Sequence, residues 1–218
     1  MAVSSDQPGL PSGSHERAAL VLRGLWLNYF TIAYNVVEAV VSLVAGVLAG
    51  SVALVGFGLD SVIEVTASGA AQWRLRSDLE PVRRARVEHL AVRVIGWTFI
   101  GLATYVFLDG AKALWLRKQP DRSVAGIAIL TLSAVVMPVL ARAKGRIARR
   151  LSSRALEGDA TQTSLCAYLS VVALVGVALN AVLGWWWADP VAALAMTPII
   201  VREGLDGIRG QACEDFGC

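Results

Sequence analysis

Four acidic side chains interrupt tracts of the sequence that are otherwise apolar: Glu38, Asp60, Glu64 and Asp159. If these tracts cross a membrane, a charged side chain near the bilayer centre costs at least about 2.5 to 3.5 kcal/mol. Four such costs are comparable with the whole stability of an ordinary domain, which is about 5 to 15 kcal/mol. Each acid must therefore be paired with a cation, protonated or bound to a metal ion.

The spacing of these groups favours metal binding. Asp60 and Glu64 are four residues apart, so both lie on one face of a helix. Residues 159, 162 and 166 are spaced i, i+3 and i+7 and share a face of a second helix. No Lys or Arg between residues 51 and 73 relieves the repulsion between the two neighbouring acids. We predict a metal site drawn from six residues: Glu38, Asp60, Glu64, Asp159, Gln162 and Cys166.

Each candidate also has a structural interpretation. The two neighbouring acids can hydrogen-bond Ser, Thr or Asn on adjacent helices, and Glu38 can bond across a helix interface near Asn35. Asp159 begins a predicted helix, where an acid can cap free N–H groups and interact favourably with the helix dipole. Gln162 can make a hydrogen bond that serves packing alone. A buried cysteine such as Cys166 often behaves as a small apolar residue.

The composition indicates an integral membrane protein. The chain has 218 residues, of which 56% are hydrophobic and only 17% charged, and its mean hydropathy is +0.57. A soluble domain needs roughly a quarter of its residues charged to cover its surface. The same values exclude a disordered chain, a secreted disulfide scaffold and a coiled coil. Three scattered cysteines are too few for a disulfide framework.

The apolar tracts predict an all-α membrane protein with six transmembrane helices. Each tract is close to the ~20 residues that a helix needs to cross ~30 Å of hydrocarbon. We predict a flexible cytoplasmic N-terminal tail over residues 1–23, a transmembrane domain over 24–208 and a short cytoplasmic tail over 209–218. Asp189, which precedes Pro190, is expected to cap the sixth helix. The predicted spans are residues 24–50, 52–75, 90–116, 124–141, 155–183 and 185–201.

The distribution of Lys and Arg predicts the orientation. The tails and the two basic loops, which include residues 142–154 with Lys144, hold 15 of these residues, and the other connections hold four. By the positive-inside rule, both termini and both basic loops face the cytoplasm. We predict a multi-pass protein of the cytoplasmic membrane. The Arg-rich loops then contact anionic lipid, and nucleic acid is not an expected partner.

The order of these motifs resembles the cation diffusion facilitator family. The resemblance rests on NVVEA from Asn35, on GSVALVGFGLDSVIE from Gly50 to Glu64, and on GDATQTSLC from Gly158 to Cys166. It implies six helices, a homodimer, and export of Zn²⁺ or a related divalent ion against protons. The family's two second-helix ligands, acids four residues apart, match Asp60 and Glu64.

Two departures from the family pattern are visible. The fifth-helix positions that the family fills with His and Asp hold Gln162 and Cys166 here. The family's usual cytoplasmic metal-binding domain has no counterpart after the last tract. The resemblance therefore implies a short branch with an altered site, one that is softer, weaker, or completed by Glu38 or Asp159.

The predicted function is efflux of a divalent metal cation by proton-coupled antiport with alternating access. Protons and metal compete for the same carboxylates, so that metal binding releases protons. The sulfur of Cys166 biases the site toward Zn²⁺ or Cd²⁺ and away from Mg²⁺ and Ca²⁺. The alternative is a non-transporting six-helix protein that senses metal or accompanies another membrane protein.

Overall fold

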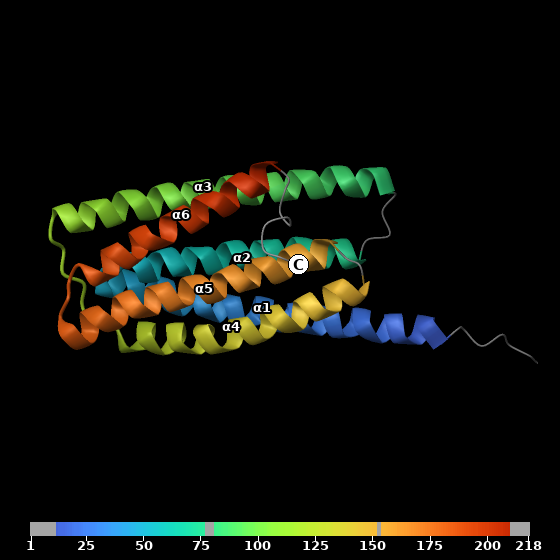
Figure 1. Ribbon diagram of the computed structural model, residues 1–218, viewed down its shortest axis with the longest axis horizontal. Helices are drawn as coiled ribbons and strands as arrows, with labels where there is room; N and C mark the ends of the chain where they lie inside the picture. Colours follow the sequence, from blue (N-terminus) through green and yellow to red (C-terminus); the bar gives the residue numbers. More distant parts are fainter. Residues whose placement is uncertain (1–11, 77–80, 152–153, 210–218) are drawn as a thin grey trace, which may run out of the picture.

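The computed structural model describes residues 12–76, 81–151 and 154–209, and this part of the chain is entirely helical outside its turns. The prediction of an all-α fold is confirmed. Figure 1 shows the helices as elongated elements lying side by side, each running opposite to the one before it. The six helices are α1 Ser12–Ala49, α2 Val52–Arg76, α3 Pro81–Trp115, α4 Val124–Leu151, α5 Arg154–Leu183 and α6 Ala188–Arg209.

Four of these helices contain segments long and apolar enough to cross a membrane, counted over the described residues. The segments are Ala19–Ala49, Val52–Gly69, Val124–Leu151 and Leu156–Leu183, in α1, α2, α4 and α5. The multi-pass character of the chain is therefore confirmed. The crossing of α3 and α6 and the cytoplasmic position of the termini stay predictions.

Each predicted span corresponds to one helix, but four helices extend well past a predicted end. α6 is one of them, because it continues to Arg209 and not to residue 201. α1 begins at Ser12 and not at residue 24, and α3 begins at Pro81 and not at residue 90. The predicted tail over residues 1–23 thus overlaps α1, while residues 1–11 and 210–218 lie outside the described residues. α4 continues to Leu151, well past the predicted end at residue 141. This extension places Lys144 inside a helix.

The helices form two groups. α1, α2, α4 and α5 pack around a common interior, with α1 against α2 and α4, and α5 against α2 and α4. α3 and α6 pack closely on each other and lie beside α2 and α5. The interior of the first group is where most of the buried polar side chains lie.

Glycine and an acidic cap define the start of α2. Gly50 ends α1 with a φ of 64°, a left-handed conformation that glycine adopts without a steric cost. Asp189 of α6 accepts hydrogen bonds from Ser51 Oγ at 2.5 Å and from the Val52 backbone N–H at 2.9 Å. Asp189 therefore caps α2, because the fold brings the starts of α2 and α6 together. The prediction that it caps the sixth helix is wrong.

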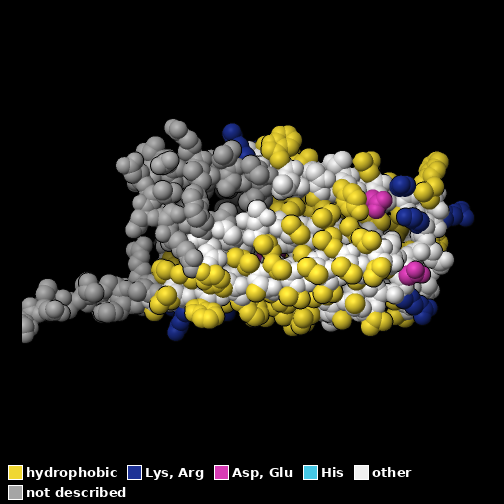
Figure 2. Space-filling model, turned by 180° about the vertical axis from the view of Figure 1, so that it is seen from behind, with side chains coloured by type: hydrophobic (Ala, Val, Ile, Leu, Met, Phe, Trp, Pro, Cys, Tyr) yellow, Lys and Arg dark blue, Asp and Glu magenta, His cyan; other side chains and the backbone are white. Residues whose placement is uncertain are grey.

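The outer surface is apolar over most of its length. Figure 2 shows hydrophobic side chains over much of the described face, with Asp and Glu toward one end and Lys and Arg toward both ends. Large apolar side chains such as Leu48 and Val182 are each 77% exposed. A soluble protein rarely exposes so large an apolar area, so this surface is suited to lipid.

The contact between α3 and α6 depends on a glycine. A Cβ added at Gly96 would lie 2.6 Å from the backbone N of Ile208 and 2.8 Å from the carbonyl O of Gly204. Backbone atoms cannot move aside as a flexible side chain can. Gly101, in the same helix, has nothing within 4 Å of the equivalent position. Gly96 thus sets how closely the two helices approach.

We predict that Gly96→Ala lowers the melting temperature of the purified protein, by an amount corresponding to about 1 to 3 kcal/mol of overpacking. Gly101→Ala serves as the matched control and should melt within about 0.5 kcal/mol of the original protein. Equal melting temperatures for the two variants would contradict a close contact at Gly96.

Candidate metal centre

Three helices direct regularly spaced polar side chains into the interior. On α1 these residues are fully buried and recur every three or four positions, a spacing that places them on one face of the helix. They are Asn28, Thr31, Asn35, Glu38 and Ser42. On α2 the buried set is Asp60, Ser61, Glu64, Ser68 and Gln72, and on α5 it is Asp159, Thr163, Cys166 and Ser170. The interior of the four-helix group therefore has a polar lining along much of its length.

Four of the six predicted site residues meet in this interior. Glu38 is 0% exposed, Glu64 and Cys166 are 1% exposed, and Asp60 is 3% exposed. Cys166 Sγ lies 3.7 Å from Glu38 Oε1, to which it donates a hydrogen bond. The same thiol also lies close to the carboxyl groups of Asp60 and Glu64. The thiol of α5 thus lies among three carboxyl groups from α1 and α2.

Several oxygen atoms of this cluster have no hydrogen-bond partner within the described structure. They include Glu38 Oε2 and both side-chain oxygens of Glu64. Nearby on α1, both amide atoms of Asn35 and the hydroxyl of Ser42 are also unpartnered. A buried polar group without a partner is costly. A carboxyl group in this situation gains stability from a bound proton or a metal ion.

The cluster is not arranged as a closed metal site in this conformation. Among the described residues, no group of three or more His, Cys, Asp or Glu side chains has its donor atoms positioned to hold one metal ion. The carboxyl groups share one buried region without converging on a single point. Side-chain rotation or a small helix movement is required before they surround an ion.

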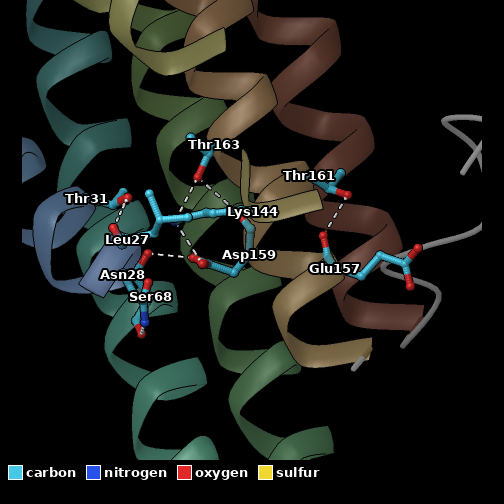
Figure 3. Close-up of polar contacts among 9 residues, drawn as sticks. All are labelled: Leu27, Asn28, Thr31, Ser68, Lys144, Glu157, Asp159, Thr161 and Thr163. Carbon is cyan, nitrogen blue, oxygen red and sulfur yellow. Dashed lines mark hydrogen bonds and ion pairs between the residues drawn. The ribbon is translucent and has the colours of Figure 1, made fainter. Parts of the chain in front are cut away.

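Asp159 has a different environment from the other acids. Its Oδ2 lies 2.8 Å from Lys144 Nζ, and the two side chains are each 1% exposed. Its Oδ1 accepts a hydrogen bond of 2.6 Å from Ser68 Oγ, whose backbone carbonyl accepts one from Asn28. Figure 3 shows these groups meeting between the helices. Asp159, predicted as a metal ligand, is therefore paired with a buried lysine.

The prediction that placed Lys144 in a basic cytoplasmic loop is wrong. Arg residues lie close to it on both sides in the sequence, so the segment has the composition of a basic loop and the helix is not evident. The signal that identifies it is helical spacing, because it continues a buried series of α4 residues at intervals of three or four: Ser133, Met137, Leu140 and Lys144. Its side chain thus points into the bundle, while Arg142 and Arg146 are exposed.

Gln162 is half-buried, and the neighbouring Thr163 is fully buried. Thr163 Oγ1 accepts a hydrogen bond from Lys144 Nζ at 3.1 Å and donates one to the backbone carbonyl of Asp159 at 3.0 Å. The interior polar face of α5 therefore runs through residues 159, 163 and 166. Sequence reasoning selected Gln162 from a spacing of i+3 and missed Thr163 at i+4.

Comparison with known proteins places this arrangement in a family. The cation efflux transmembrane domain matches residues 29–210. The match includes the four helices that build the polar interior and the α3 and α6 pair. The chain belongs to the cation efflux family. The predicted resemblance to the cation diffusion facilitators is thereby confirmed.

Several relatives in this family are transporters by name. The chain is 31% identical over 192 residues to the uncharacterised transporter YdbO of Bacillus subtilis, covering 84% of this chain and 64% of that protein. It is 24% identical over 182 residues to the manganese efflux system protein MneS of the same organism, covering 81% and 62%. With transmembrane protein 163 of Xenopus laevis it shares 27% identity over 145 residues, or 66% and 51%. The chain spans about half to two thirds of the length of these relatives.

We predict that Cys166 reacts far more slowly with a water-soluble maleimide than a thiol at the bundle surface, because it is 1% exposed. The measurement uses Cys213→Ser/Cys218→Ser protein, in which Cys166 is the single thiol. The control replaces all three cysteines with serine and introduces Lys118→Cys at an exposed position. Similar labelling rates for the two proteins would contradict the burial of Cys166.

Proposed function

We propose that this cation efflux protein exports a divalent metal cation, with Zn²⁺ as the favoured ion and protons as the counter-ion. The observation that carries the proposal is the group of three carboxyl side chains, Glu38, Asp60 and Glu64, buried around the thiol of Cys166. Membership of the cation efflux family supports transport as its purpose.

The ligand set we propose is Asp60, Glu64 and Cys166, with Glu38 as the fourth donor. Zn²⁺ accepts carboxylate oxygen and thiolate sulfur in tetrahedral geometry at about 2.0 to 2.3 Å. Metal binding gives the unpartnered oxygens of Glu38 and Glu64 the interactions that they lack in this conformation. Gln162 is half-buried, one turn before Cys166 on α5, and is an alternative donor, whereas Asp159 is already paired.

The sulfur atom is the reason for favouring Zn²⁺ over a harder ion. Thiolate ligands suit Zn²⁺ and Cd²⁺, while carboxylate and carbonyl oxygens alone suit Mn²⁺ and Mg²⁺. One relative is named as a manganese efflux system protein. Mn²⁺ is therefore the competing candidate, and the contribution of Cys166 distinguishes the two.

Proton coupling follows from the same atoms. In a buried site the metal-free carboxyl groups favour the protonated form, since desolvation and mutual repulsion disfavour the charged form. Metal binding requires these protons to leave, so metal and protons occupy the site alternately. Alternating access to the two sides of the membrane then exchanges one for the other.

The membrane arrangement we propose has six crossings, both termini in the cytoplasm and a homodimer in the cytoplasmic membrane. α2 and α4 run in the same direction (Figure 1), so α3, which joins them, must return along the bundle. α6 runs back from the end of α5 over part of that length. The exposed apolar surface provides the area for lipid and for a second copy of the chain.

We predict that proteoliposomes holding the protein take up Zn²⁺ when their interior is acidic, and that the internal pH rises as the metal enters, because protons leave in exchange. Asp60→Asn should reduce the initial rate of Zn²⁺ uptake at least about tenfold. Loss of a residue that only supports a metal ligand typically has an effect of that size, and loss of a ligand itself should have at least as large an effect. Asp121→Asn, an exposed position in a turn, is the control and should keep the original rate.

Two results would overturn this function in different ways. Zn²⁺ binding with proton release but without flux would indicate a metal-sensing protein. Absence of both would indicate an accessory protein without a metal site. Full activity of the Asp60→Asn variant at equal reconstitution would refute the site and leave transport itself standing.

We also predict that Cys166→Ser lowers the rate of Zn²⁺ and Cd²⁺ transport relative to that of Mn²⁺, because a neutral hydroxyl replaces a soft thiolate ligand. Competition between the three ions in the same vesicles measures the ratio. Ser170→Ala, a buried polar change on the same helix face, is the matched control. An unchanged ratio in Cys166→Ser would exclude the thiol as a ligand.

A further inference from the structure

Lys144 brings a positive charge from α4 into the polar interior beside the proposed metal site. Its side chain is 1% exposed. Its Nζ contacts Asp159 Oδ2 at 2.8 Å and donates a hydrogen bond to Thr163 Oγ1 at 3.1 Å, both on α5. Lys has three N–H donors, so its ammonium group can make one more strong interaction. Figure 3 shows the lysine lying across the space between α4 and α5.

Both carboxylate oxygens of Asp159 are occupied in this network. Lys144 binds one oxygen from α4, and Ser68 donates to the other from α2. The Ser68 carbonyl in turn accepts a hydrogen bond from Asn28 of α1. Side chains of α4 and α2 therefore hold Asp159 of α5 in place, and α1 is joined to the same network through the Ser68 backbone.

Glu64 lies one helical turn before Ser68 on the same buried face of α2, and Ser68 bonds Asp159, the partner of Lys144. The positive charge of the lysine therefore also acts on the Glu64 carboxylate. Asp159 Oδ2 is held by the ion pair with Lys144 and Oδ1 by the hydrogen bond from Ser68, whereas neither Glu64 oxygen has a partner at hydrogen-bonding geometry in the described structure. The lysine thus has two acidic neighbours, of which it pairs with one. Asp159 holds the ammonium group and leaves Glu64 unpaired on the side of Asp60 and Cys166.

We propose that Lys144 is a tethered counter-cation that sets the metal affinity of the neighbouring site, and that Asp159 is its positioning partner and not a metal ligand. This inference rests on the proposed function. The pair is neutral as a whole, so a divalent ion at Asp60 and Glu64 meets little net repulsion from it. Without Asp159, the ammonium group of Lys144 would compete with the metal ion for the carboxylate of Glu64. Without Lys144, the carboxylate of Asp159 would add an unpaired negative charge beside the metal ion.

The inference predicts that the two single variants change the Zn²⁺ affinity in opposite directions. Asp159→Asn frees the ammonium group and should weaken Zn²⁺ binding at least about tenfold, since charges a few ångströms apart interact strongly inside a protein. Lys144→Met frees Asp159 and should tighten Zn²⁺ binding by a similar factor. The double variant removes both charges and should bind Zn²⁺ within about threefold of the original protein. Rescue of Asp159→Asn by Lys144→Met is the decisive result.

The experiment measures Zn²⁺ binding by calorimetry to the full chain in lipid nanodiscs, for the original protein and the three variants, with Lys144→Arg as the charge-conserving control. Melting temperatures are recorded separately, because loss of one partner of a buried ion pair also destabilises the fold. If a single variant does not fold, the charge-neutral double variant and Lys144→Arg still carry the test. Both should bind Zn²⁺ within about threefold of the original affinity.

Three results would overturn the inference. A double variant as weak as Asp159→Asn would make Asp159 a metal ligand. Equal Zn²⁺ affinity in all variants, with changes in melting temperature alone, would make the pair a purely structural tie. Absence of Zn²⁺ and Mn²⁺ binding to the original protein would overturn the proposed function as well, and only that result affects both.

Discussion

The cost of holding ionisable groups away from water governs this structure. An isolated charge in a medium of low dielectric is too costly to retain, so it is paired, neutralised by a proton or bound to a metal ion. The bundle shows the first solution at Asp159, where Lys144 and Ser68 bind both oxygens. It leaves Glu38 and Glu64 with oxygens that have no partner in the described residues. These incompletely satisfied acids are the groups that a proton or a metal ion can stabilise.

The helical architecture follows from the need to separate polar and apolar surfaces. α1, α2, α4 and α5 turn polar faces inward and leave apolar side chains on the outside (Figure 2), the reverse of a soluble bundle. α3 and α6 form a second layer beside α2 and α5, held closely where Gly96 allows the backbones to approach. This arrangement places the polar interior and the apolar outer surface on different faces of the same helices.

The sequence predicts the helices and part of the site well, because those signals are local. Apolar tracts of sufficient length identify six helices, and a spacing of four residues places Asp60 and Glu64 on one face. Helix ends are predicted less well, since α4 continues through an Arg-rich segment that resembles a loop. The misplacement of Lys144 follows directly from that error. Asp189 is a second case, because the hydrogen-bond donors to its carboxylate lie more than 130 residues earlier in the chain, at the start of α2.

The sequence by itself determined that the chain is helical, enters a membrane and carries acids there at spacings suited to metal binding. It also indicated the family, because the order and spacing of the motifs are visible in the sequence without any knowledge of which residues are in contact. Only the tertiary structure decided which acid is paired and which acids remain unsatisfied. The reason is physical: a side chain's helix and spacing depend on nearby residues, whereas its charge partner depends on which faces of distant helices meet. Lys144 and Asp159 are neighbours only because α4 and α5 pack against each other.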